Sequence, residues 1–174
     1  WAFATVAAAE TNLIVQGLAD SSIDLSELHL AKHLHNDSVV DPLGNFTGDI
    51  VKLPDGSESN FLEFGGASSF IGHLLFRWTG LADEETMMYE DAEYSLEREY
   101  PDEYANSSNT YRIKNYYDVY NNEENQDKIK LNIMKYGSAN ISISSELDGF
   151  SERNEAYYQN KTQFTNHAVI IVGW

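Results

Sequence analysis

Residues 1–18 read WAFATVAAAETNLIVQGL and predict a helix whose circumference is mostly apolar. The pattern begins at Trp1 and is rich in alanine throughout its first half. A helix that is apolar around most of its circumference packs against neighbours on several sides. We therefore expect a central, buried helix at the start of this chain.

Both ends of the chain are unusual for a complete domain. No Ser, Thr, Asp or Asn stands before Trp1 to cap the free N–H groups of the predicted helix. At the other end, NHAVIIVGW (residues 166–174) is a β-branched apolar run that stops without a turn signal. We expect both ends to lie inside a larger protein, with any secretion signal upstream.

Composition limits the class of protein. With 174 residues, of which 42% are hydrophobic, the chain is predicted to form one globular folding unit. Its 11 basic and 28 acidic side chains give a net charge of −17, which makes nucleic acid a poor partner. No stretch approaches the ~20 consecutive apolar residues of a membrane-spanning helix. The absence of cysteine excludes disulfides, thiolate metal sites and a thiol nucleophile within this chain.

Further elements follow from local pattern. Helices are predicted at residues 25–34, where Ser26 can act as the N-cap, at 65–80, and at 129–137, where Gly137 ends the helix. Strands are predicted at 111–120, 139–145 and 166–173. A helical first half followed by a mostly β second half indicates an α+β protein with a boundary near residue 110.

The sequence also contains an acidic segment and two weak metal-like patterns. Residues 83–103 hold ten acids and one base, which is typical of a solvated surface insertion. His29 and His33 are four residues apart, with His35 nearby, but the pattern favours a polar helix face over a metal site. Asp55, Ser57 and Ser59 resemble only the start of a calcium loop. An acid-rich, calcium-binding surface protein therefore stays open as a hypothesis.

His167 is the histidine that most needs an explanation. It precedes the apolar residues Ala168, Val169 and Ile170, where an imidazole must find a partner or lose solvation. The pattern by itself favours a hydrogen-bonded structural histidine.

Four blocks in order change that interpretation. WAFATVAAAETNLI followed by DLSELHL resembles the central helix and next helix of papain-like cysteine peptidases, beginning one residue after the nucleophile. The pair Gly65-Gly66 resembles the glycines lining the substrate cleft of that family, and KYGSANISIS resembles one of its strands with Ser138 in place of the usual proline. NHAVIIVGW resembles the block that holds the catalytic histidine. The acidic insertion and the lack of cysteine pairs are more similar to bacterial secreted or surface members.

The resemblance implies a fold and a site. The fold would be papain-like, with a helical first lobe (residues 1–110), a β-barrel-like second lobe (residues 111–174, incomplete at its C-terminal end) and a cleft between them. His167 would be catalytic, while Gly65, Gly66 and Trp1 would bind a polypeptide substrate. No metal or other cofactor is implied, the location would be extracellular or cell-surface, and the oligomeric state stays open.

The chain lacks part of the machinery that this family uses. The nucleophilic cysteine would stand just before Trp1, so the chain by itself is expected to be inactive, although the parent protein would be a cysteine endopeptidase. The alternative is a catalytically inactive papain-like module that binds peptide or glycan at the cell surface. The residue before Trp1 in the parent protein distinguishes the two.

Overall fold

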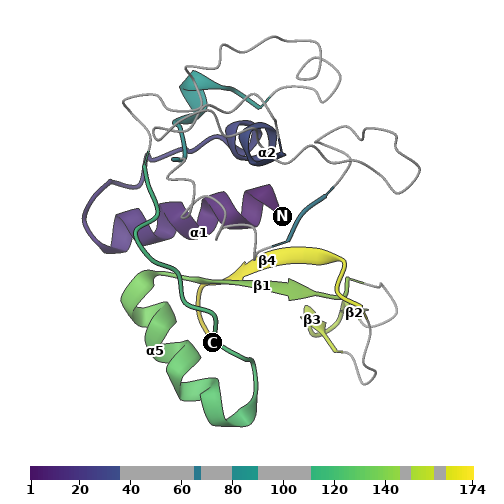
Figure 1. The fold of residues 1–174 in the computed structure, drawn as a ribbon. Helices are drawn as coiled ribbons and strands as arrows, with labels where there is room; N and C mark the ends of the chain where they lie inside the picture. Colours follow the sequence, from purple (N-terminus) through teal and green to yellow (C-terminus); the bar gives the residue numbers. More distant parts are fainter. Residues whose placement is uncertain (36–64, 68–79, 90–110, 146–149, 159–163) are drawn as a thin grey trace.

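The computed structural model describes residues 1–35, 65–67, 80–89, 111–145, 150–158 and 164–174, which are drawn in colour in Figure 1. The elements, in chain order, are α1 (Ala2–Val15), α2 (Glu27–His35), η2 (Glu84–Thr86), η4 (Glu123–Asn125), α5 (Gln126–Tyr136), β1 (Ala139–Ile143), β2 (Phe150–Ser151), β3 (Ala156–Tyr157) and β4 (His167–Ile171). Helices and 3-10 turns precede the strands, so the predicted α+β class is confirmed.

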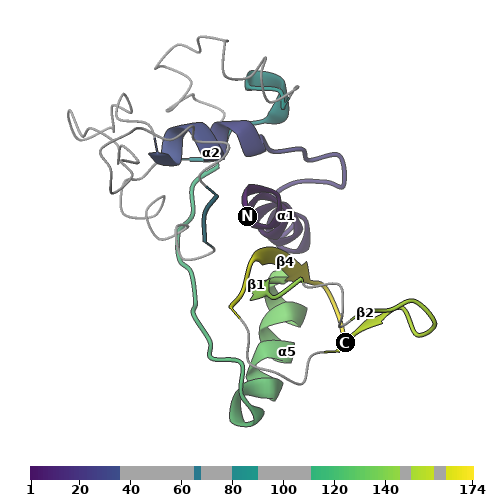
Figure 2. The ribbon, with the colours of Figure 1, turned by 90° about the vertical axis from the view of Figure 1, so that its right-hand side faces the viewer.

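Helix α1 is the central element, as the sequence predicts. In both views it lies between α2 and the strand pair formed by β1 and β4 (Figures 1 and 2). Its first turns are buried at Ala2, Ala4, Thr5 and Val6, but Val15 at its end is 50% exposed. The expectation of burial along the whole helix is therefore wrong for the second half, where Leu13 still packs against the core but Ile14 and Val15 are exposed.

The core of the first lobe joins α1 to α2. Its buried apolar residues are Ala2, Val6, Leu25, Leu30 and Leu81. The predicted cap is confirmed, because Ser26 Oγ accepts a hydrogen bond from the His29 backbone N–H at 2.9 Å. The same hydroxyl donates to the carbonyl of Met87, so the start of α2 is tied to the segment after η2.

Two predictions are affected by this core. Residues 83–89 begin the segment expected to be a solvated insertion; Glu85, Met88 and Tyr89 are exposed there as expected, whereas Met87 is fully buried and Asp83 forms a β-bridge with Leu25. Residues 90–103 lie outside the described part. His29, expected on a polar face, is also fully buried. Its neighbours in α2, Leu28 and Leu30, are buried as well, so this part of the helix is covered on more than one side.

The strand predicted at residues 111–120 is also wrong. Tyr111 forms an isolated bridge with Leu81, and residues 112–120 continue as irregular chain. This segment contacts α5 through a side chain instead of pairing as a strand: the Tyr117 ring stacks on the Tyr136 ring of α5, with ring centroids 5.7 Å apart. The helix predicted at 65–80 lies largely outside the described residues, as does the calcium-like pattern at Asp55.

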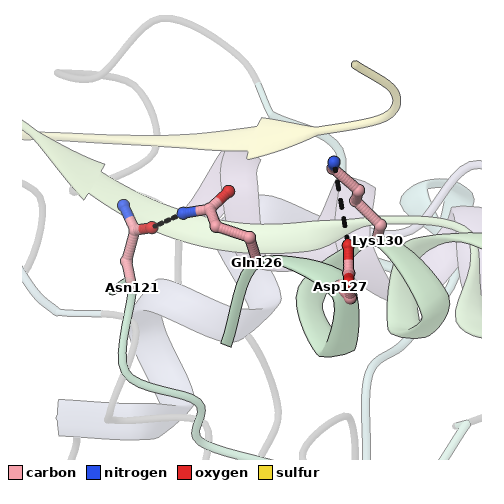
Figure 3. Close-up of polar contacts among 4 residues, drawn as sticks. All are labelled: Asn121, Gln126, Asp127 and Lys130. Atoms are coloured by element: carbon pink, nitrogen blue, oxygen red, sulfur yellow. Dashed lines mark hydrogen bonds and ion pairs between the residues drawn. The ribbon is translucent and has the colours of Figure 1, made fainter. Parts of the chain in front are cut away.

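Helix α5 ends as its sequence predicts but begins at Gln126, before the predicted start at Ile129. Figure 3 shows Gln126 donating from Nε2 to Asn121 Oδ1 at 2.9 Å, and Lys130 lying 4.0 Å from Asp127. Asp127 in the first turn and Lys135 in the last have the signs that favour the helix dipole. At Gly137 the backbone has φ of +102°, so the helix ends there.

Strands β1 and β4 form an antiparallel pair with its register fixed from Ala139 opposite Ile171 to Ile143 opposite His167. Both predicted strands are thereby confirmed. Ala168 to Ile171 are half-buried rather than fully buried, because α1 covers the pair from one direction. A separate short hairpin pairs β2 with β3.

The second half of α1 holds the turn between α5 and β1. Thr11 Oγ1 lies 2.7 Å from Ser138 Oγ. The next residue, Asn12, donates to the carbonyl of Tyr136 at 3.0 Å, and Gln16, about one turn further along, donates to the carbonyl of Lys135 at 2.9 Å. These two amide groups satisfy carbonyls at the C-terminal end of α5 that have no acceptor role within that helix. We call this set of contacts the α1–α5 clamp.

Gly137 fits the clamp only because it lacks a side chain. A Cβ at this position would lie 2.6 Å from the carbonyl oxygen of Thr11, a backbone atom that cannot rotate away. We predict that Gly137→Ala destabilises the fold by about 2–5 kcal/mol, the sum of backbone strain and overpacking. The measurement is chemical denaturation. Gly17→Ala is the matched control: Gly17 also has positive φ, +68°, but a Cβ there meets nothing within 4 Å. It should cost only about 1–2 kcal/mol, and equal losses would contradict the close approach.

Acidic side chains gather where α1, α2 and η2 meet. Burial raises the pKa of Glu27, and the nearby charges of Glu84, Glu10 and Asp24 raise it further. Burial likewise raises the pKa of Glu84, with a contribution from Asp24. Within the described part of the chain, Glu84 Oε2 is buried without a hydrogen-bond partner, which disfavours a charge on this carboxyl.

This cluster makes part of the stability depend on pH. A carboxyl with a raised folded-state pKa favours folding below its unfolded pKa, and that contribution is lost as pH rises through the folded pKa. We predict that Glu84→Gln, which keeps the acceptor oxygen for the backbone N–H of Tyr89, raises the melting temperature at pH 7 more than at pH 4. Glu85→Gln, on the exposed neighbour, is the control and should give no such pH-dependent difference. A gain of equal size at both pH values would contradict the raised pKa.

Candidate active site

His167 is the first residue of β4 and lies at one end of the strand pair. Its cross-strand partner is Ile143, the last residue of β1, and its side chain is exposed. The strand register therefore determines which end of the sheet carries the imidazole.

The contacts between α1 and β1 determine what lies at that end. Thr11 meets Ser138 just before β1, and Thr5 accepts a hydrogen bond from Asn140 Nδ2 at 3.3 Å within the strand. The helix and the strand therefore run in opposite directions, so the end of β1 approaches the first turn of α1. Figure 1 shows the arrow of β1 pointing to the side where the N-terminus lies. His167 and Trp1 are thus at the same end of the helix–sheet layer.

The first turn of α1 is well fixed. The carbonyl of Trp1 accepts from both the backbone N–H and the Oγ1 of Thr5, each at 3.0 Å. Trp1 is the N-cap residue, and its side chain makes no capping hydrogen bond. A helix end whose N–H groups are not capped by a side chain carries partial positive charge and favours an anion nearby.

Gly66 packs directly against this turn. A Cβ on Gly66 would lie 2.3–2.6 Å from three atoms of the Trp1 indole, so the ring occupies the place of a side chain. Gly65 has φ of +75°, a conformation that glycine adopts at little cost. The structure therefore brings together Trp1 and Gly66, two of the residues singled out in the sequence, and leaves their role toward substrate as a prediction.

Asn166 holds the entry to β4 and was not recognised from the sequence as a site residue. Its backbone N–H donates to the carbonyl of Ile143 at 2.9 Å, and its Oδ1 accepts from the N–H and Oγ of Ser145 at 2.7 and 3.0 Å. These bonds fix the backbone immediately before His167. The available signal was a polar amide placed directly before the histidine.

The metal-like patterns receive no support. In the part of the chain that the structure describes, no group of three or more His, Asp or Glu side chains is arranged as metal ligands. His29, in α2, is buried, and the side chains of His33 and His35 lie outside the described residues. None of the described helices is long and apolar enough to cross a membrane.

An α+β fold with a histidine at a strand start, at the same end as the first turn of a central helix, defines a papain-like architecture. Comparison with family models agrees: the model of the papain family cysteine protease matches residues 65–174, more than half of the chain. The chain belongs to the papain family.

Two solved structures share this fold. The first is the crystal structure of the cysteine protease and lectin-like domains of Cwp84, a surface layer associated protein of Clostridium difficile, at 22% identity and a TM-score of 0.63. The second is a cysteine-to-alanine variant of the clostridial cysteine protease Cwp84 after propeptide cleavage, at 23% identity and a TM-score of 0.64. Each comparison covers 99% of this chain but only 33% and 37% of the other, about a third of its length. No curated protein matches the sequence significantly.

The bonds of Asn166 generate a prediction about the backbone at His167. Asn166→Ala removes an acceptor of two hydrogen bonds and should destabilise the fold by about 1–2 kcal/mol. It should also speed amide hydrogen exchange in residues 164–167. Asn166→Asp keeps the acceptor oxygens and should stay close to the unsubstituted protein. Exchange that is unchanged in the alanine variant would show that these bonds do not hold the strand entry.

Proposed function

We propose that the parent protein is a cysteine-type endopeptidase whose nucleophile is a cysteine directly before Trp1 and whose general acid–base residue is His167. The observation that carries this proposal is the strand register, which puts His167 at the same end of the molecule as the first turn of α1. Membership of the papain family supports the reaction class, hydrolysis of peptide bonds.

The physical chemistry of this end suits a thiolate. A cysteine before Trp1 would lie at the positive end of α1, and an adjacent imidazolium would lower its thiol pKa further. The thiolate would attack the scissile carbonyl, and the imidazolium would give its proton to the leaving amine. Trp1 and Gly65-Gly66 would border the bound peptide. Since this chain contains no cysteine, it is expected to be inactive on its own.

The cell surface is the proposed location and polypeptide the proposed substrate. Support for the location comes from Cwp84, which is described as a surface layer associated protein. We also propose that the lobe boundary falls near residue 110, because the bridge of Leu81 with Tyr111 links the two parts of the chain there. A polypeptide substrate follows from the protease family itself.

The second candidate is an inactive papain-like module that binds peptide or glycan at the surface. Serine, alanine or glycine before Trp1 in the parent protein would favour this binder, because none of these side chains provides a thiolate. Cysteine at that position would favour the enzyme.

Thiol reactivity tests the enzyme directly. The parent protein should be alkylated by iodoacetamide at pH 5–6 much faster than free cysteine, because an ordinary thiol has a pKa of ~8.5 and is almost wholly protonated there. Alkylation at the rate of free cysteine would refute the ion pair.

Replacing the imidazole supplies the second arm of this test. His167→Ala should lower kcat/KM for a peptide substrate by at least ~100-fold, because general acid–base catalysis and the partner of the thiolate are lost together. Asn166→Asp keeps the acceptor oxygens that hold the backbone before β4, so it is the control, and its kcat/KM should fall much less. Near-normal turnover in the His167 variant would show that another residue acts as the base.

A further inference from the structure

The contact between Trp1 and Gly66 links two parts of the proposed site. Segment 65–67 comes from a different region of the chain than α1, and in Figure 2 it passes beside the N-terminus between α2 and β4. A Cβ on Gly66 would lie 2.3, 2.4 and 2.6 Å from Cε2, Cδ2 and Nε1 of the Trp1 indole. Real Cβ atoms essentially never come this close to another heavy atom, so any side chain at position 66 must displace the ring or its own segment.

The ring is attached to a backbone position that is held in place. Trp1 is the N-cap of α1, and its carbonyl is held by two hydrogen bonds from Thr5. Thr5 is 1% exposed, and Ala2 belongs to the buried core against which Trp1 packs. A side chain at position 66 would therefore either turn the indole about its own side-chain bonds or push on a turn that the core anchors from behind.

The neighbouring glycine provides a contrast within the same segment. Gly65 has positive φ, but a Cβ there would meet nothing within 4 Å. Position 65 thus requires glycine for its backbone conformation, whereas position 66 requires it for the space that the indole fills. The two positions therefore require glycine for different physical reasons.

We propose that Trp1 and Gly66 are positioning residues: the indole seated on Gly66 sets the first turn of α1 and thereby the direction of the residue that precedes Trp1. This inference rests on the proposed function for its catalytic consequence. It predicts that a peptide lying along Gly65-Gly66 presses on the same ring that orients the nucleophile. Occupancy of the cleft and reactivity of the thiol are then coupled through one side chain.

The experiment uses the parent protein and five variants. These are Gly66→Ala, Gly65→Ala, Trp1→Leu and the two double variants that combine Trp1→Leu with each glycine change. For each we measure the melting temperature, kcat and KM for a peptide substrate, and the rate of alkylation by iodoacetamide.

Gly66→Ala should lower kcat and the alkylation rate about tenfold each, with a smaller effect on KM, as expected for overpacking by 1–3 kcal/mol at the helix end. Trp1→Leu makes room, so the double variant with Gly66→Ala should be faster than Gly66→Ala alone. The loss in Gly65→Ala, which arises from backbone strain, should not be rescued by Trp1→Leu.

Two kinetic results would overturn the proposal. A rise in KM with unchanged alkylation would mean that Gly66 serves only the approach of substrate, and a loss that Trp1→Leu does not relieve would mean that the indole is not the obstacle. If the parent protein has no reactive thiol, the proposed function fails, but the melting temperatures still decide the contact. The proposal is supported if the changes in melting temperature are non-additive for Trp1→Leu with Gly66→Ala but additive for Trp1→Leu with Gly65→Ala. Additive changes for both pairs overturn it.

Discussion

The close approach of Gly137 to the backbone of Thr11 is the constraint on which the arrangement of this molecule depends. Because Gly137 has no Cβ, the turn between α5 and β1 can lie directly on α1. Asn12 and Gln16 then donate to the last carbonyls of α5, and Thr11 meets Ser138 at the start of the strand. With this end of β1 fixed, the direction of the strand and its pairing with β4 carry His167 to the opposite end of α1.

The two halves of α1 therefore make different kinds of contact. Its first half is packed in the apolar core, which keeps the first turn in place at the proposed site. Its second half is more exposed and holds the second lobe by polar contacts. A helix anchored in this way can present its positive N-terminal end toward an anionic group, while the strand pair brings a titratable side chain to the same place. The acids between α1, α2 and η2 lie on the other side of this helix and affect stability through burial.

The sequence predicts the regular elements of this fold better than their surroundings. The apolar helix at residues 1–18, the cap at Ser26, the stop at Gly137 and the individual strands β1 and β4 follow from local rules, because each depends on residues close in sequence. The exposed end of α1, the buried Met87 and the irregular path of residues 112–120 depend on which distant segments meet, and local pattern carries no such information. For the site, resemblance picked out His167, Gly66 and Trp1. The hydrogen bonds of Asn166 and the packing of the Trp1 indole on Gly66 depend on contacts between distant segments, which the sequence does not reveal.

The central claim is that α1 and the strand pair bring His167 to the residue that precedes Trp1. The most direct measurement is a crystal structure of the parent protein that includes this residue. The account predicts that its side chain lies within about 4 Å of an imidazole nitrogen of His167, the range of a loosened hydrogen bond in a free enzyme. A separation well beyond that distance, with α1, β1 and β4 paired as described above, would contradict the account.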